Sequence, residues 1–563
     1  MIVKSAEELA KKQREISIAE FFEKNRHLLG FDNPRRALLT AVKEAVDNAL
    51  DACEEARVLP EVNVELIQLE ETRFRMVVED NGPGIIKKQV PKIFGKLLYG
   101  SKFHKLSATR GQQGIGISAA VLYAQLTTGK PATIISKTGK DNPAYQLKLK
   151  INTQTNEPQI LEEAEIPWEG KEHGTRIEID FEGSYMKGRQ SVDEYLKETA
   201  IVNPHVTIIY TNPEATQLLF PRAMEELPPE PREIKPHPYG VELGRLLKML
   251  EITSAKTLQQ FLTEEFVRVG PGTAQQICQN AALLPNTKPK QVSREMVEKL
   301  HKGIQATKII APPTDSISPI GADQLEKGLR KEVNAEFYCS TTRPPEVYRG
   351  NPFIIEASIA FGGEQDAEST VRIMRFANRV PLLYQQGACA ITQAIQATAW
   401  RSYGLQQSKN SLPAGPCTLV VHMTSVWVPF TSESKEALAH YPEIMKEIKL
   451  ALQECGRKLS LFVNKKRRIK EESKKRSYIE KYIPHVAEAL QEITKVSAEE
   501  KKKLEENLYE LLEHTRGELE ELTVENPEYD EEFAKIGAEE EDSEQEKEQE
   551  KPEKKEKQKK LIE

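Results

Sequence analysis

The sequence predicts a multidomain α+β protein. Its 563 residues exceed what one hydrophobic core usually spans, since single cores rarely grow beyond about 250–300 residues. Apolar residues at helical spacing and apolar runs of strand length both occur before residue 227, whereas the segment 235–308 carries helical patterns alone. Strand-like runs at 353–361 and 417–423 then precede a long helical pattern that starts near Tyr441. This order indicates two mixed α/β domains separated by a helical one.

The first informative motif lies on a helix that the apolar spacing predicts from Pro34 onward. Glu44 and Asn48 are four residues apart, so they project from one face with Cβ atoms roughly 6 Å apart. Asp51 follows on the same side. A Glu-x-x-x-Asn pair alone is more often a solvated helix face than a site, so its meaning depends on the motifs that follow.

The second motif is Asp80-Asn-Gly82-Pro-Gly84, which comes directly after an apolar run of strand length at 74–79. Every residue type in it favours turns, so a plain turn would explain it when it is taken alone. A buried aspartate at a strand end can also accept a hydrogen bond from the amino group of adenine. The two glycines would let the base approach the backbone.

The third motif is the glycine-rich segment 111–116, which precedes a helical pattern. Glycines leave backbone N–H groups free to face an anion, so a phosphate would sit at this helix N-terminus. A single motif of this kind is weak evidence. The polar segment 94–110 between the second and third motifs is expected to form a lid, from which Ser101 and Lys102 would reach the ribose or a phosphate.

In this order, and with His173-Gly174-Thr175 before a strand, the motifs resemble those of the GHKL ATPases, which include gyrase B-type subunits, Hsp90, MutL and histidine kinases. The resemblance implies a Bergerat α/β sandwich that binds ATP and Mg²⁺. It assigns activation of the attacking water to Glu44, Mg²⁺ coordination to Asn48 and adenine recognition to Asp80. Thr175 would lie near the base, and the segment 111–118 would wrap the triphosphate.

A segment far downstream selects a branch of this superfamily. Val428-Pro-Phe-Thr-Ser-Glu-Ser-Lys435-Glu-Ala resembles the transducer loop of the B subunits of type IIB DNA topoisomerases, in which a lysine reaches the γ-phosphate. Segments 375–384 and 400–405 resemble the same subunits, and the similarity runs over about residues 15–470. Lys435 alone would suit an exposed lysine at a helix start, but the matched flanking residues favour the catalytic role.

The resemblance thus names two catalytic residues, Glu44 and Lys435, and a larger nucleotide-binding set. That set comprises Asn48 (also the Mg²⁺ ligand), Asp51, Asp80, Gly82, Gly84, Ser101, Lys102, Gly111, Gln112, Gln113, Gly114, Ile115, Gly116, Ile117, Ser118, Thr175 and Lys435.

Composition and the resemblance together predict five segments. They are an N-terminal dimerisation arm (1–20), the GHKL ATPase domain (21–227), a helix–two-turns–helix domain (228–310), a ribosomal-S5-like α/β transducer with a long C-terminal helix (311–470), and a charged tail that passes from helical to disordered (471–563).

Two segments are candidates for contact with DNA phosphates. A glycine turn at 270–272 stands before a helix, with Arg268 and Lys256 nearby, although a tight turn between helices would explain it equally well. The basic stretch 465–476 would otherwise be a solvated helix end. The formal net charge of −7 gives no overall indication of nucleic-acid binding, so such contacts must be local.

The six cysteines are scattered singly, without a C-x-x-C motif. This pattern is typical of a reducing cytosol and disfavours structural zinc or a disulfide framework. The N-terminus lacks an apolar signal segment, and no stretch of about eighteen apolar residues occurs. We therefore expect a cytoplasmic chain that does not enter a membrane.

DNA cleavage would need a tyrosine nucleophile and an acidic Mg²⁺-binding cluster, and no suitable acidic motif is found in the sequence. The resemblance therefore implies a separate cleavage partner, the topoisomerase A subunit, in an A2B2 heterotetramer. It also implies ATP-dependent homodimerisation of the ATPase domain around double-stranded DNA, and relaxation and decatenation by ATP-gated duplex passage.

Other classes remain alternatives at this point. A mismatch-repair or chaperone GHKL protein would share the ATPase half, but neither is expected to carry the helical segment 235–308 or the loop around Lys435. A histidine kinase needs a phosphoacceptor histidine on a dimerisation helix, and none of the ten histidines has that setting. A non-catalytic DNA clamp would not need the intact Glu44 and Asn48.

Overall fold

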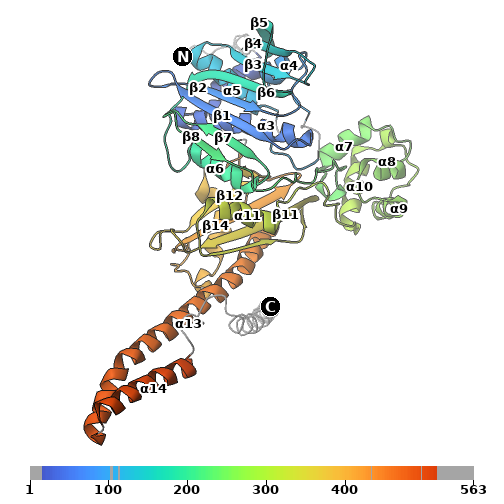
Figure 1. Ribbon diagram of the computed structural model, residues 1–563. Coiled ribbons are helices and arrows are strands. Elements are labelled where there is room, and N and C mark those ends of the chain that lie inside the picture. The colour runs from blue at the N-terminus through green and yellow to red at the C-terminus, as the bar shows by residue number, and fades with distance from the viewer. Residues whose placement is uncertain (1–14, 102–105, 112–113, 433, 496, 517–563) are drawn as a thin grey trace, which may run out of the picture. The chain divides into compact units, whose positions relative to one another are not determined.

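The computed structural model describes residues 15–101, 106–111, 114–432, 434–495 and 497–516 (Figure 1). These residues form two compact units. The first comprises the chain up to Gln365 together with Arg372–Ala397 and Cys417–Leu452. The second comprises Asp366–Val371, Thr398–Pro416 and the described residues from Gln453 onward.

The N-terminal part of the first unit is an eight-stranded sheet covered by helices (Figure 1). The strand order is β5-β4-β3-β6-β2-β1-β7-β8, and each pair is antiparallel except β1 with β7. The strands are β1 (Glu61–Gln68), β2 (Arg73–Asp80), β3 (Ala132–Lys137), β4 (Ala144–Asn152), β5 (Glu157–Ile166), β6 (Gly174–Glu182), β7 (Thr207–Thr211) and β8 (Gln217–Phe220). The helices are α2 (Ile18–Lys24), η1 (Arg26–Leu29), α3 (Pro34–Glu55), α4 (Val90–Gly95), α5 (Gly116–Thr128) and α6 (Val192–Val202).

Helix α3 begins where the sequence predicts it. The Asn33 side chain accepts a hydrogen bond from the Arg36 amide, and Pro34 occupies the first turn, where its missing N–H has no cost. Val42, Val46 and Leu50 are fully buried in the core between the helices and the sheet. The predicted strand at 74–79 and the predicted helix after the glycine segment are confirmed by β2 and α5.

The middle of the first unit is helical, as predicted for 235–308. It contains η2 (Pro238–Gly240), α7 (Leu243–Ile252), α8 (Leu258–Glu265), α9 (Pro271–Asn280), η3 (Pro289–Gln291) and α10 (Arg294–Ala306). These helices have a hydrophobic core of their own, in which Phe261 and Leu300 are fully buried. Helix α9 starts immediately after Gly270, and Arg268 and Lys256 are both exposed.

A second, six-stranded sheet follows, with the order β10-β11-β14-β12-β13 and with β9 also paired to β11. Its strands are β9 (Phe337–Thr342), β10 (Glu346–Tyr348), β11 (Asn351–Phe361), β12 (Arg372–Ala377), β13 (Val380–Pro381) and β14 (Cys417–Ser425). The helices of this region are α11 (Ala322–Glu332), η4 (Gln386–Ala388), α12 (Ala390–Ala397) and the start of α13 (Pro442–Thr494). The predicted strands and long helix are present, although α11 precedes the first strand.

In the second unit, helix α13 packs on the segment 398–416, which includes η5 (Trp400–Tyr403). A Cβ added at Gly456 would collide with the Tyr403 ring, and one added at Gly404 would lie 2.8 Å from Val463, so this packing is close. The helical part expected at the start of the tail (471–563) is present in the described residues as the end of α13 and as α14 (Ala498–Arg516). Residues 517–563 of the predicted tail and residues 1–14 of the predicted arm lie outside the described residues.

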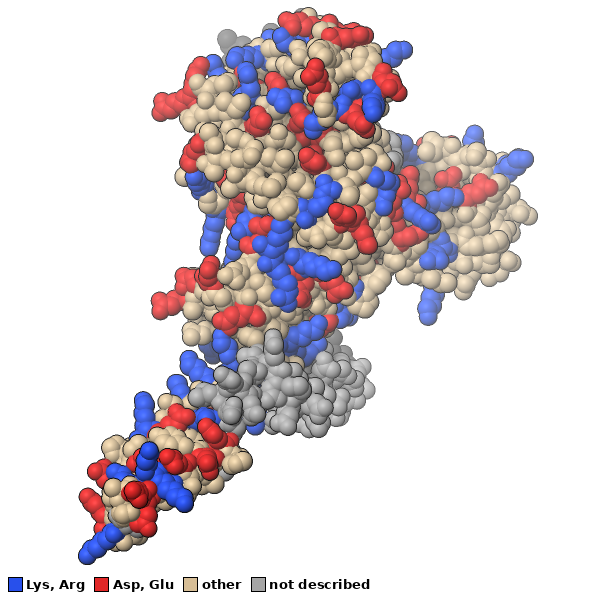
Figure 2. Space-filling model, viewed as in Figure 1, with Lys and Arg blue, Asp and Glu red and all other residues tan. Residues whose placement is uncertain are grey.

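Acidic and basic side chains are interspersed over the face drawn in Figure 2. All six cysteines are buried. Among the described residues, no helix combines the length and the apolar composition needed to cross a membrane.

Candidate nucleotide site

Most of the predicted site residues line a cavity of about 590 Å³ in the first unit. Its walls come from helices α3, α4 and α5, from strands β2 and β6, and from two segments that follow the second sheet's strands β13 and β14. The predicted residues that line it are Glu44, Asn48, Asp80, Gly84, Ser101, Gly111, Gly114, Ile115, Gly116, Ile117, Thr175 and Lys435.

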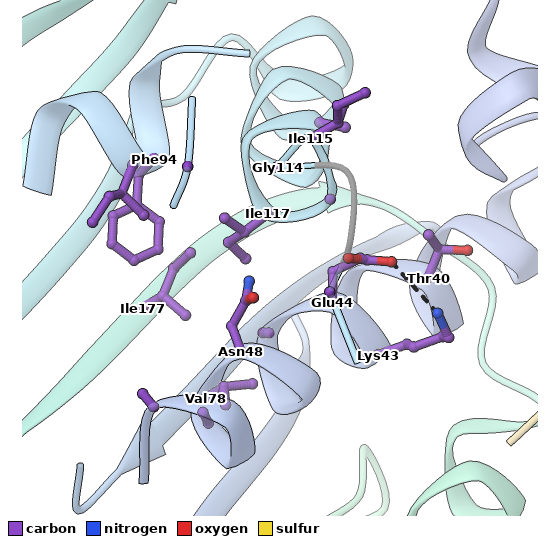
Figure 3. Close-up of a pocket in the computed structure, with 18 of the residues that line it drawn as sticks. Thr40, Lys43, Glu44, Asn48, Val78, Phe94, Gly114, Ile115, Ile117 and Ile177 are labelled. Carbon is purple, nitrogen blue, oxygen red and sulfur yellow. Dashed lines mark ion pairs between the residues drawn. The ribbon is translucent and has the colours of Figure 1, made fainter. Parts of the chain in front are cut away.

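Glu44 points from α3 to the N-terminus of α5 (Figure 3). A Cβ on Gly116 would collide with the Glu44 carboxylate, so glycine at this position is what lets the carboxylate reach the helix terminus. Lys43 Nζ lies 3.5 Å from Glu44 Oε1 and 3.7 Å from Asp47 Oδ2. Burial opposes the charge on Lys43, but Glu44 and Asp47 outweigh it and raise the pKa of this lysine.

Asn48 projects into the cavity one turn after Glu44 (Figure 3). On the side of Asn48 away from Glu44 the wall is apolar and includes Val78, Phe94 and Ile177. The cavity therefore has a charged, polar end beside the glycine segment, lined by Lys43, Glu44 and Lys435, and an apolar end that suits a flat aromatic ring.

Asp80 is buried at the end of β2, at the apolar end of the cavity. Its Oδ1 accepts hydrogen bonds from the Gly82 amide at 2.8 Å and the Thr175 amide at 3.2 Å. Burial raises the pKa of Asp80 to about 6, although these amides favour the charged form. Gly84 has φ +70°, and a Cβ there would collide with the Lys137 carbonyl, so the turn after Asp80 needs glycine.

Lys435 enters the cavity from the loop after β14. Its backbone is left-handed with φ +54°, an uncommon conformation for a lysine. Its Nζ donates to the Arg110 carbonyl at 3.2 Å, just before the glycine segment. Burial lowers the pKa of Lys435, and the nearby Glu44 partly opposes this effect.

Three predicted residues do not line the cavity. Asp51 instead accepts a hydrogen bond from Arg110 Nη1 at 2.9 Å. The amide of Gly82 donates to the Asp80 carboxylate. The hydroxyl of Ser118 donates to the Ile115 carbonyl at 2.9 Å. Predicted residues Lys102, Gln112 and Gln113 lie outside the described part of the chain.

Comparison with known families decides among the alternatives. The family described as histidine kinase-, DNA gyrase B-, and HSP90-like ATPase matches residues 37–175, and the family described as topoisomerase VI B subunit, transducer, matches residues 312–475. The chain is 51% identical to the B subunit of type 2 DNA topoisomerase 6 from Methanococcoides burtonii, over 86% of this chain and 78% of that protein. The B subunit of type 2 DNA topoisomerase 6 from Archaeoglobus fulgidus is 49% identical over 86% of this chain and 80% of that protein.

The chain belongs to the family of type 2 DNA topoisomerase 6 B subunits. Its resemblance to GHKL ATPases and to B subunits of type IIB topoisomerases is thereby confirmed, and so is the predicted combination of a GHKL sandwich with a transducer. A more distant member, from Natronomonas pharaonis, is 37% identical over 87% of this chain and 84% of that protein.

The sequence did not indicate that Arg110 belongs to the site. The guanidinium is buried and bonds to Asp51, to both carboxylate oxygens of Glu54 (2.7 and 2.8 Å) and to Asn203 Oδ1 at 2.5 Å. His205 Nε2 lies 2.7 Å from Glu54. Burial opposes the charge on Glu54, but Arg110 outweighs it and lowers the pKa of this carboxyl. The only local signal for Arg110 is its place just before Gly111.

Sequence reasoning also missed the wall that comes from the transducer side. Pro381, Leu383 and Tyr384 line the cavity together with Glu436. The segment 375–384 resembles the family in sequence, but nothing in its pattern shows that its end lines the cavity.

Proposed function

We propose that this cavity binds and hydrolyses ATP, and that the chain thereby gates the passage of one DNA duplex through another. The observation that carries the proposal is the convergence of Glu44, Asn48, Asp80 and Lys435 on one cavity of about 590 Å³. The first three come from α3 and β2, and the fourth comes from a loop more than 380 residues after Glu44.

The apolar end suits adenine. An ionised Asp80 carboxylate would accept a hydrogen bond from the exocyclic amino group, and Val78 and Ile177 would cover the faces of the base. Because the Gly82 and Thr175 amides already hold Asp80 Oδ1, the carboxylate is oriented before nucleotide arrives.

The polar end suits the triphosphate. Gly111, Gly114 and Gly116 precede or begin helix α5, whose N-terminus attracts negative charge. Glu44 lies at this terminus, where its carboxylate would orient a water and take its proton during attack on the γ-phosphate.

Asn48 would hold Mg²⁺. Its amide oxygen is a ligand of the type that Mg²⁺ prefers, and Mg²⁺ is usually bound by one or two protein oxygens together with substrate phosphates and waters. Asn48 lines the cavity one turn after Glu44, where a single protein oxygen beside bound phosphates would suit this mode. Bound Mg²⁺ would neutralise charge on the phosphates.

Lys435 would contact the γ-phosphate and would therefore favour ATP over ADP. A ligand shifts a conformational equilibrium only by its different affinity for the two states. Lys435 belongs to the transducer region and Glu44 to the ATPase region. This contact would therefore make ATP and ADP favour different arrangements of the two regions.

The partners belong to the same proposal. The A subunit would supply DNA cleavage in an A2B2 heterotetramer, and ATP would drive homodimerisation through the arm at residues 1–20. The helical region around Arg268 and Lys256, both exposed, and the basic stretch at 465–476 would contact double-stranded DNA phosphates. The segment boundaries at 20, 227, 310 and 470 remain predictions.

The test compares Glu44→Gln with Glu71→Gln, a control at an exposed position. In the presence of the A subunit, ATP and supercoiled DNA, we expect Glu44→Gln to lower the ATP hydrolysis rate by about 10²–10⁴-fold, to abolish relaxation and to keep binding of a non-hydrolysable analogue. The control should match the wild type in all three assays. A wild-type hydrolysis rate in Glu44→Gln, or relaxation without ATP, would refute the proposal.

A further inference from the structure

Glu436, the residue after Lys435, is buried and bonded through both carboxylate oxygens. Arg36 Nη2 donates to Oε1, and Gln385 Nε2 donates to Oε2 at 2.8 Å. An ionised carboxylate held by two donors in a buried setting is oriented strongly, because charge-assisted hydrogen bonds are about twice as strong as neutral ones.

Arg36 is itself fixed in place. Its Nη1 donates to Asp32 Oδ1 at 2.6 Å, and its guanidinium carbon lies 5.5 Å from the centre of the Tyr384 ring. Arg36 stands in the first turns of α3, the helix that carries Glu44 further along. Glu436 therefore ties the loop of Lys435 to the helix of the proposed catalytic carboxylate.

The loop around Lys435 is closed by its own backbone. The Thr431 amide donates to the Ala437 carbonyl at 2.9 Å, and the Lys435 amide donates to the Ser432 carbonyl at 3.1 Å. These bonds shape the turn and hold Lys435 in its left-handed conformation, which is a strained one for a lysine. They do not join the loop to α3, whereas Glu436 does.

We propose that Glu436, through Arg36 and Gln385, is a positioning residue that sets the place of Lys435 relative to Glu44 in the nucleotide site. The inference rests on the proposed role of Lys435 at the γ-phosphate. Both carboxylate oxygens of Glu436 accept from Arg36 and Gln385, so we expect it to act through the loop and not by contact with the phosphate. It fixes the loop, so that the lysine side chain needs to adjust only its own rotamers when ATP binds.

The test is a steady-state ATPase assay of the full chain, together with the A subunit and DNA, on Glu436→Gln, Lys435→Met and the double variant. We expect Glu436→Gln to lower kcat at least about tenfold while KM for ATP stays within twofold, because the adenine end is untouched. In the Lys435→Met background, Glu436→Gln should change kcat by less than twofold. Glu443→Gln, an exposed glutamate in the first turn of α13, is the matched control.

Gln385→Ala is a second, milder variant in case Glu436→Gln fails to fold. It removes one of the two donors to Glu436 and should lower kcat in the same direction. Equal kcat in wild type, Glu436→Gln and Gln385→Ala would overturn the inference. The inference would also fail if the fold reductions in kcat caused by Glu436→Gln and by Lys435→Met multiplied in the double variant. If Lys435→Met hydrolysed ATP and relaxed DNA at wild-type rates, the proposed role of Lys435 would be wrong. That result is distinct from a failure of the role proposed for Glu436.

Discussion

Asp51 and Arg110 form a buried ion pair beside the nucleotide cavity, with Arg110 Nη1 2.9 Å from Asp51 Oδ1. Asp51 follows Glu44 and Asn48 on α3, and Arg110 directly precedes the glycine segment. The Gly111 amide also lies 3.4 Å from Asp51 Oδ2. Asp51 thus anchors the start of the glycine segment to the helix of the proposed base.

Asp51→Asn should therefore destabilise the chain. The substitution leaves Arg110 with Glu54 and Asn203 as partners, so we expect a loss of about 1–3 kcal/mol in the free energy of unfolding, less than for an arginine left unpaired. Urea denaturation of Asp51→Asn is compared with Asp141→Asn, at an exposed loop position. Equal midpoints for both variants would contradict the anchoring role.

Gly116→Ala should block turnover. The new Cβ would meet the Glu44 carboxylate, which must then leave the N-terminus of α5, and misplacement of a catalytic group by about 1 Å can cost about 100-fold in rate. Single-turnover hydrolysis measures the effect. Gly244→Ala on α7, where a Cβ meets nothing within 4 Å, is the control. A Gly116→Ala rate within a few-fold of the control would show that Glu44 need not occupy this place.

Nucleotide binding should weaken as the pH falls through about 6. The pKa of Asp80 is raised to about 6 by burial, and the ionised carboxylate is the better acceptor for the adenine amino group. Binding of a non-hydrolysable analogue, measured between pH 7 and pH 5, should fall more steeply in the wild type than in Asp80→Asn. The nucleotide's own phosphates also titrate near 6, but they affect both proteins alike. Parallel pH profiles would refute the assignment.

The raised pKa of Asp80 makes folding stability change with pH in the opposite direction to nucleotide binding. The folded chain holds a proton on Asp80 that the unfolded chain releases from about pH 4 upward, so this group favours folding most below about pH 4. The contribution is lost as the pH rises through about 6. Asp80→Asn should accordingly show a flatter dependence of the free energy of unfolding on pH across this window, measured by urea denaturation.

Asn378→Ala should loosen the segment that leads into the phosphate loop. Asn378 Nδ2 donates to the Thr109 carbonyl at 3.1 Å and to the Ser425 carbonyl at 3.0 Å, and its Oδ1 accepts from the Ser425 amide at 2.9 Å. We expect a loss of about 2 kcal/mol in stability and a raised KM for ATP. Asn410→Ala is the control, because Asn410 is exposed and also has a left-handed backbone. A KM equal to that of the control would contradict the link to Thr109.

Much of the fold follows from local signals. The start of α3 at Pro34, the strand before Asp80 and the helix after the glycine segment are each set by residues within one or two turns of the motif, so the sequence predicts them. Pairings across the fold carry no such signal. Arg36 and Glu436 are 400 residues apart, and Arg110 and Asp51 are joined only because α3 packs against the end of the lid segment.

The cavity also has a mechanical consequence. One part of the cavity lining, with Glu44, belongs to α3, and another part, with Lys435, belongs to the loop after β14. By reciprocity, whatever pulls these two parts apart must weaken the hold on nucleotide by the same free energy with which nucleotide resists the pull. Under the proposed function, DNA that moves these two elements apart would therefore lower the affinity for ATP without contacting the nucleotide.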